Sequence, residues 1–205
     1  MSKVSKKKTV CNLIILDASG SMESKKEDVK GGLKQLFDDI KENTKLNQRV
    51  IIAQFDNTFK VLCDVDASEL DYSIIEKYKP SGSTALYDAM GIGFNMVPNS
   101  VDGVFVSIIT DGEENASKIF NKEVIKSMIK SKNELNWGIT FSGTSEEAIY
   151  NAKDIGILNT LQTTNDSKGL NKMSASRSQA YGSFTSSVER GLSSAEYNTT
   201  TLFTE

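Results

Sequence analysis

The sequence contains no histidine, and its 205 residues include only two cysteines, two prolines and one tryptophan. The lack of histidine excludes Ser-His-Asp and Cys-His catalysis, and also zinc or haem held by histidine. Two cysteines are too few for a disulfide framework, and because Cys11 and Cys63 lie in apolar runs, we interpret both as core residues. Carboxylates, hydroxyls, lysines and thiols are the reactive groups that remain.

Long apolar runs and an excess of one charge are also missing. No stretch approaches the roughly 20 apolar residues that a membrane-spanning helix needs, and the start of the chain does not resemble a secretory signal. The 24 Lys and Arg residues nearly balance the 27 Asp and Glu residues, for a net charge of -3. Such a balance leaves no field of one sign to hold nucleic acid or an anionic membrane. We therefore expect a cytoplasmic protein that binds neither.

Apolar patterning predicts the order of strands and helices. Continuous apolar runs at residues 10–16 and 101–110 are typical of strands buried on both faces of a parallel sheet. Residues 49–55 and 59–65 predict a hairpin, which would add one antiparallel edge strand. The other expected elements are a strand at 137–141 and helices at 27–44, 71–78, 84–96, 120–129, 144–156 (opened by a capping box at Thr144) and 181–192.

This alternation predicts an α/β fold, with a three-layer, doubly wound and mostly parallel sheet that has helices on both faces. No repeat or linker divides the chain, so we expect a single domain over residues 1–205. Its core should span about residues 8–192, with Phe184, Val188 and Leu192 docking the last helix on the sheet. Residues 193–205 are polar, and we expect a flexible tail there.

Polar side chains follow the two buried strands. An Asp-x-Ser-x-Ser motif comes directly after the first strand, with a glycine that permits a tight turn, and a Thr-Asp-Gly motif ends the second. A third loop, residues 80–84, supplies a hydroxyl ahead of a helix. In doubly wound sheets, ligands bind beyond the carboxyl ends of the strands. The candidate ligands that we expect at this rim are Asp17, Ser19, Ser21, Thr84 and Asp111.

Each candidate residue could instead be an ordinary helix cap or turn residue. Together at one rim, however, they indicate a bound cation, because two carboxylates without a nearby histidine or motif lysine would repel each other. Hydroxyl and carboxylate oxygens suit a hard ion, and the small number of carboxylates favours Mg²⁺ or Mn²⁺ over Ca²⁺. We interpret the adjacent Lys25 and Lys26 as part of a solvated surface.

With these motifs in this order, the sequence resembles the von Willebrand factor type A domains over roughly residues 8–192. All five positions of that family's metal-ion-dependent adhesion site are present. The resemblance implies that Ser19 and Ser21 bind the metal directly and that Asp17 acts largely through water. It also implies that Thr84 and Asp111 exchange direct and water-mediated roles. Residues 78–88 and 110–115 look most like the small stand-alone bacterial and phage members of the family. If the protein is encoded by a phage, the expected location is the cytoplasm of the host.

The function that we predict is non-enzymatic, Mg²⁺-dependent binding of an unidentified protein partner that presents an Asp or Glu side chain. One alternative is a structural or assembly component, for instance of a phage, in which the metal only locks the loops. The other is a magnesium-dependent phosphohydrolase with Asp17 as nucleophile, which is less favoured because Ser19 stands where the common phosphatase motif has a second acid. The sequence does not predict the oligomeric state.

Overall fold

The computed structural model describes residues 6–164, 167–192 and 202–203. These residues form a six-stranded sheet in the order β3-β2-β1-β4-β5-β6. Every neighbouring pair is parallel except β2 and β3. The strands are β1 (Thr9–Asp17), β2 (Asn47–Phe55), β3 (Phe59–Asp66), β4 (Gly103–Ile109), β5 (Trp137–Gly143) and β6 (Asn159–Gln162). The expected mostly parallel sheet with one antiparallel strand is confirmed.

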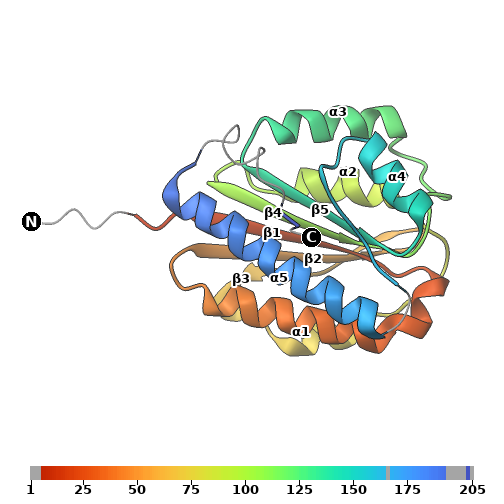
Figure 1. Cartoon of the computed structure of the whole chain (residues 1–205), viewed down its shortest axis with the longest axis horizontal. Coiled ribbons are helices and arrows are strands. Elements are labelled where there is room, and N and C mark those ends of the chain that lie inside the picture. The colour runs from red at the N-terminus through yellow and green to blue at the C-terminus, as the bar shows by residue number, and fades with distance from the viewer. Residues whose placement is uncertain (1–5, 165–166, 193–201, 204–205) are drawn as a thin grey trace, which may run out of the picture.

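Helices cover both faces of the sheet (Figure 1). The α-helices are α1 (Lys26–Glu42), α2 (Leu86–Met96), α3 (Lys122–Asn133), α4 (Glu146–Asp154) and α5 (Ser167–Arg190). Helices α1 and α5 pack side by side on one face, while α2, α3 and α4 contribute to the core on the other. The three-layer α/β architecture is therefore as predicted.

The central strands β1 and β4 are buried along almost their whole length. Alternate residues of β1 enter opposite cores: Ile14 and Leu16 face α1 and α5, whereas Leu13 and Ile15 face α2. A strand with two buried faces needs apolar residues at nearly every position, which explains the continuous apolar runs in the sequence. Both strands deliver the residues that follow them to the same edge of the sheet.

The two edge strands differ from the central ones. Along β3, exposed and half-buried residues alternate around the buried Leu62, and a register shift interrupts its pairing with β2 between Ile52 and Ala53. Strand β6 is four residues long and was not predicted, because its sequence, Asn-Thr-Leu-Gln, lacks an apolar run. Its residues are half-buried or exposed, so burial imposes little apolar pattern on it.

Some boundaries differ from the expected ones for identifiable reasons. Helix α4 is capped by Ser145, whose hydroxyl accepts the Ala148 N–H, and not by Thr144. Residues 72–77 form a 3-10 helix, which ends just ahead of Pro80. Helix α5 begins at Ser167, well before the start expected at residue 181. The sequence did not predict this first half of the helix because it is rich in serine and shows only a weak apolar pattern.

The expected tail falls mainly outside the described residues, which resume only at Leu202 and Phe203. Both of these side chains are buried, and the Leu202 N–H donates to Asn159 Oδ1 over 2.8 Å. They belong to the same core cluster as the buried residues of α1 and α5, so this part of the chain end is docked instead of frayed.

Cysteine burial agrees with the interpretation of both residues as structural. Cys11 is fully buried and Cys63 is half-buried, and both are free thiols. Burial raises the pKa of Cys11 to about 12 and that of Cys63 to about 11. Neither thiol is therefore activated as a nucleophile.

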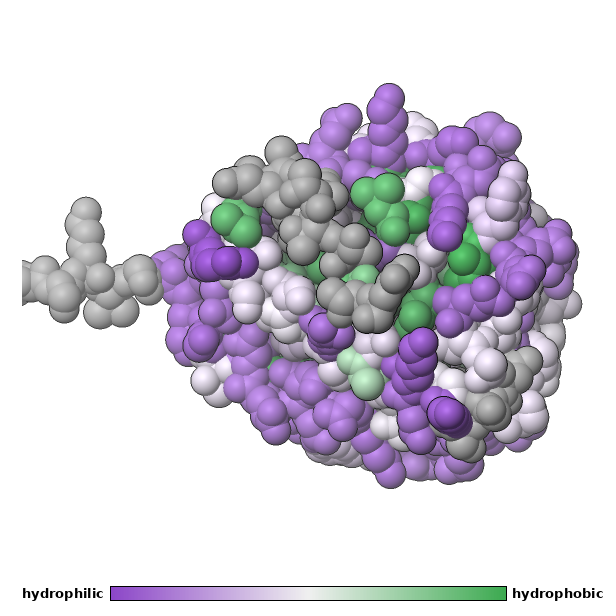
Figure 2. All heavy atoms as spheres, in the orientation of Figure 1, coloured by the Kyte–Doolittle hydropathy of each residue, from purple (hydrophilic) through white to green (hydrophobic). Residues whose placement is uncertain are grey.

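Among the described residues, no helix combines the length and apolar character needed to cross a bilayer. Figure 2 shows hydrophilic side chains over most of the viewed face, with hydrophobic ones gathered between α5 and the helices α3 and α4.

Candidate metal site

Asp17 ends β1 and is completely buried beneath the rim of the sheet. Its Oδ1 accepts the Ser19 N–H over 2.7 Å and its Oδ2 accepts the Thr110 hydroxyl over 2.5 Å. The Tyr78 hydroxyl fixes the same residue from below by donating to its carbonyl oxygen over 2.6 Å. Burial raises the pKa of Asp17, and the hydrogen bonds from Thr110 and Ser19 oppose that rise. The Ser19 N–H and the Thr110 hydroxyl thus hold the carboxylate in one orientation, and Tyr78 holds the backbone beneath it.

The hydroxyls of Ser19 and Ser21 link this loop to the loop after β4. Their Oγ atoms lie 3.1 Å apart, and Ser21 Oγ donates to Asp111 Oδ1 over 2.7 Å. Ser19 precedes the 3-10 helix Gly20–Lys25, but its side chain makes no capping hydrogen bond there. A capping role therefore does not explain Ser19.

Lys25 departs from the interpretation as a solvated residue. It is only 8% exposed, and its Nζ donates to Asp111 Oδ2, which forms an ion pair. Lys25 is the last residue of the 3-10 helix Gly20–Lys25, whose tight winding directs its side chain back towards the rim. The sequence alone does not show this direction. The motifs themselves contain no lysine, but Lys25, four residues after Ser21, supplies a counter-charge to Asp111, so the interpretation of Lys25 as a solvated surface residue is wrong.

Thr84 joins the site from the loop before α2. It is buried, and it does not cap the helix, whose N-cap is Ala85. Its backbone is fixed by Asn115, which accepts the Thr84 N–H at Oδ1 over 3.0 Å and donates its own N–H to the Thr84 carbonyl over 3.0 Å. A Cβ atom at Gly112 would lie 2.9 Å from Thr84 Oγ1 and 3.5 Å from Asp17 Oδ2, so the glycine keeps this space clear.

Direct backbone bonds tie the loops to one another. The Gly20 N–H donates to the Gly82 carbonyl over 3.1 Å, and the Ser81 N–H donates to the Ala18 carbonyl over 2.5 Å. Gly82 has a φ of 74°, and a Cβ there would lie 2.5 Å from Asn57 Oδ1. The conformation of the loop at residues 80–84 therefore depends on glycine at this position.

Acidic residues around the rim have structural partners. Asp56 accepts the Thr58 N–H and the Ser81 hydroxyl, and Glu114 accepts the N–H groups of Tyr87 and Ser117. Asp88, on the first turn of α2, accepts three backbone N–H groups, each over 2.8 Å, from residues 118, 119 and 120. It is not on a solvated helix face, because it anchors the loop between β4 and α3.

We expect Asp88→Ala to lower the free energy of unfolding by about 2–4 kcal/mol, because three N–H groups of that loop lose their acceptor. Burial alone would raise the pKa of Asp88, but these N–H groups outweigh burial and lower it. The stabilisation is therefore present above the pKa of an unfolded aspartate, about 3.9, and is lost as the pH falls through the lower folded value. Urea unfolding at pH 7 and pH 3 measures both effects. Asp28→Ala, an exposed acid on α1, should change stability by less than about 0.5 kcal/mol.

Hydrogen bonds thus join four of the expected residues, Asp17, Ser19, Ser21 and Asp111, into one cluster. The fifth, Thr84, lies beside Gly112, whose missing side chain leaves space between Thr84 and Asp17. Sequence reasoning missed Tyr78, Asn115 and Lys25, which hold the cluster from outside. Only two of the five side chains are carboxylates, and no group of three or more His, Cys, Asp or Glu side chains among the described residues is placed to hold a metal. The donor set is therefore dominated by hydroxyls, which fits a small hard cation better than a carboxylate-rich calcium site. The five expected ligands are Asp17, Ser19, Ser21, Thr84 and Asp111.

Residues 13–114 match the sequence model of the von Willebrand factor type A domain. None of the curated proteins matches the sequence significantly. Among solved structures, a von Willebrand factor type A protein from Catenulispora acidiphila is 16% identical with a TM-score of 0.63, over 84% of this chain and 42% of that chain. The PilB minor pilin from Streptococcus sanguinis is 12% identical with a TM-score of 0.63, over 86% of this chain and 62% of that chain.

Proximal thread matrix protein 1 from the mussel byssus, solved with a zinc-occupied MIDAS motif, is 17% identical with a TM-score of 0.61. The match covers 84% of this chain and 45% of that chain. The chain therefore spans less than two thirds of the length of each of these three proteins. At such identities, the likeness shows the fold.

Proposed function

This chain carries a von Willebrand factor type A domain, a module that commonly mediates protein interaction or adhesion, and from this we propose a metal-dependent binding function. The rim of the sheet binds one Mg²⁺ or Mn²⁺, and the bound ion in turn binds an acidic side chain of a protein partner. The observation that carries the proposal is the convergence of hydroxyl and carboxylate oxygens from three separate loops. The Ser19–Ser21–Asp111 hydrogen bonds link the first loop to the last, and the Gly20–Gly82 backbone bond joins the loop of Thr84 to the first.

The residues that would hold the ion are Asp17, Ser19, Ser21, Thr84 and Asp111. A divalent ion there would supply positive charge and a coordination position that a partner carboxylate could take from water. The chain itself orients the ligands: Thr110 and the Ser19 N–H fix Asp17, while Asn115 fixes the backbone of Thr84. Without a divalent cation, the Lys25 ammonium is already paired with Asp111, so the rim offers no coordination position to a partner acid and Asp17 adds a second carboxylate beside it.

The loop-locking alternative is less well supported. The loops are already joined directly, by the Gly20–Gly82 and Ser81–Ala18 backbone bonds and by the Lys25–Asp111 ion pair. A cation is therefore not required to hold the loops together. Its positive charge is better suited to binding an acidic side chain of a partner.

The phosphohydrolase alternative also lacks support. Asp17 is completely buried, and both of its carboxylate oxygens accept hydrogen bonds within the protein. A nucleophilic carboxylate needs an oxygen directed at the substrate. We therefore propose a non-enzymatic role, and we expect no phosphate release from a generic aryl phosphate in the presence of Mg²⁺.

We expect partner capture to require the divalent ion. A pull-down from the native host in Mg²⁺ should recover a protein that excess EDTA releases, and Ca²⁺ should replace Mg²⁺ poorly because it needs more ligands and longer bonds. Ser21→Ala should weaken capture as partial metal loss does, whereas Ser127→Ala, an exposed position on α3, should not. A partner retained equally in Mg²⁺ and in EDTA would overturn the proposal. In the partner, the critical Asp or Glu should tolerate exchange for the other acid better than exchange for its neutral amide.

A further inference from the structure

Lys25 is an unusual lysine in this fold. Its side chain is 10% exposed and the side chain of its partner Asp111 is 5% exposed, so the ion pair lies almost entirely within the protein. Taking two charged groups out of water is unfavourable unless each has a good partner. The neighbouring Lys26 shows the ordinary arrangement, with its Nζ 3.5 Å from Glu23 Oε1 and side-chain exposures of 29% and 61%.

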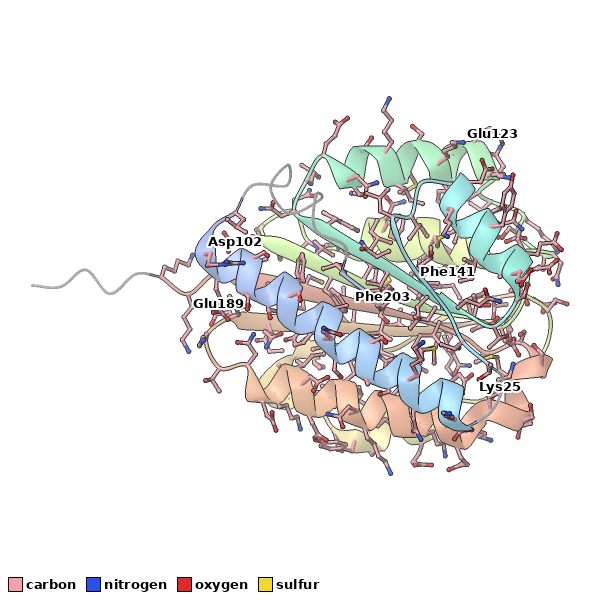
Figure 3. The ribbon with its side chains drawn as sticks, in the orientation of Figure 1. Lys25, Asp102, Glu123, Phe141, Glu189 and Phe203 are labelled. Carbon is pink, nitrogen blue, oxygen red and sulfur yellow. The ribbon has the colours of Figure 1, made fainter. Side chains whose placement is uncertain are left out.

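Both carboxylate oxygens of Asp111 are in use. Oδ1 accepts the Ser21 hydroxyl and Oδ2 accepts the Lys25 ammonium. Figure 3 shows Lys25 at the edge of the sheet where the chain passes from β1 towards α1. Its bond to Asp111, which also accepts the Ser21 hydroxyl, places it beside the proposed metal ligands. An ammonium group at this carboxylate supplies positive charge to the rim from within the chain.

We propose that Lys25 is an internal counter-ion of the site, which a divalent cation must displace from Asp111, so that Lys25 sets the affinity for metal. This inference rests on the proposed function. A lysine and a metal ion repel each other at a single carboxylate, and their binding to Asp111 is therefore mutually exclusive or strongly antagonistic. Lysine suits such a role because its ammonium sits on a flexible four-carbon stem that can swing from a rim position into solvent.

The arrangement has two consequences for the site. In the absence of metal, the ion pair keeps the Asp111 carboxylate neutralised and its loop attached to the first turn after β1. In the presence of metal, part of the binding free energy is used to break that pair, so the affinity is lower than the oxygen ligands alone would give. This is a negative coupling between two cations at one site.

The test compares Lys25→Met with the matched control Lys26→Met. Titration with MnCl₂, followed by calorimetry and by the electron paramagnetic resonance signal of free Mn²⁺, should give a dissociation constant at least about tenfold lower for Lys25→Met than for the wild type, within the usual range of coupling between sites. Lys26→Met should bind as the wild type does. Lys25→Arg keeps the charge and should keep the weaker binding.

Thermal unfolding provides a second measurement on the same proteins. In EDTA, Lys25→Met should unfold at a lower temperature than the wild type, because Asp111 loses its counter-ion, and MnCl₂ should raise its midpoint more than that of the wild type. If Lys25→Met folds only when MnCl₂ is present, the expected loss of stability in EDTA is complete. Lys25→Arg, which should fold without metal, can then be compared with the wild type for its affinity for Mn²⁺.

The outcomes separate this inference from the proposed function. If the wild type binds Mn²⁺ and Lys25→Met binds it with unchanged affinity, the counter-ion role is overturned and the metal site stands. An equal gain in Lys26→Met would also overturn it, because the effect would then be one of general surface charge. If no variant binds Mn²⁺, both proposals fail.

Discussion

Truncation after Asn171 is expected to abolish cooperative folding and to leave an aggregating chain. The deletion removes most of α5, whose buried residues include Ala180, Tyr181, Phe184 and Val188. The Phe105 ring of β4 packs on two of them, with centroids 5.5 Å from Tyr181 and 5.6 Å from Phe184. Each large apolar side chain contributes about 1.5–3 kcal/mol on burial, so the combined loss is comparable to the whole stability of a typical domain.

Circular dichroism during heating and size-exclusion chromatography measure this result. Phe184→Ala offers a graded version, with an expected loss of about 3–5 kcal/mol, and Ser186→Ala on the exposed side of α5 is its control. A chain ending at Leu192 should keep its cooperative transition, since among the described residues it loses just the burial of Leu202 and Phe203 and the Leu202–Asn159 hydrogen bond. A soluble chain ending at Asn171 that melts cooperatively would show that α5 is not required for the core.

Asp111→Ala is expected to weaken Mg²⁺ binding at least tenfold, equivalent to roughly 1.4 kcal/mol or more. The substitution removes one of the two carboxylates of the proposed ligand set and also the acceptor of the Ser21 hydroxyl. Calorimetric titration with MgCl₂ measures the change. The matched control is Glu113→Ala, an exposed acid two positions further along the same loop, which should leave the affinity unchanged.

The same variant should also lower the free energy of unfolding, because it leaves the Lys25 ammonium at the rim without its carboxylate partner. Adding Lys25→Met should recover part of that stability, while the metal affinity should stay below that of the wild type because the ligand is still missing. Equal affinity for Mg²⁺ in the wild type and Asp111→Ala would remove Asp111 from the site.

The central sheet could be predicted from the sequence because its strands are buried on both faces. Continuous apolar runs follow directly from that burial, as they do in β1 and β4. Helix α1 could be predicted equally well from the sequence, since Val29, Leu33 and Phe37 recur at helical spacing and all face the core. The candidate ligands could be placed at one rim because parallel strands end at the same edge of a sheet.

The remainder depends on contacts that no local pattern contains. Lys25 and Arg177 are charged residues that a sequence places on the surface, yet both are buried. Arg177 donates from Nη2 to the Gly32 carbonyl over 2.6 Å, across the interface between α5 and α1. Such partners are far away along the chain, so only the packed structure identifies them. The extent of α5 was underestimated for the same reason, because polar residues of its first half bond to α1, as Arg177 does to Gly32 and Ser178 to Asp39.

The edges of the sheet bear on how this protein behaves at high concentration. An unpaired edge strand offers free N–H and C=O groups on which another molecule can add a strand, the first step of many aggregation reactions. Strand β3 presents the exposed charged residues Lys60, Asp64 and Asp66 along that edge, and Arg49 Nε holds Asp64 over 2.7 Å. At the opposite edge, β6 is only four residues long. Charge at one border and shortness at the other oppose sheet extension between molecules, which protects a chain whose central strands are among its most apolar segments.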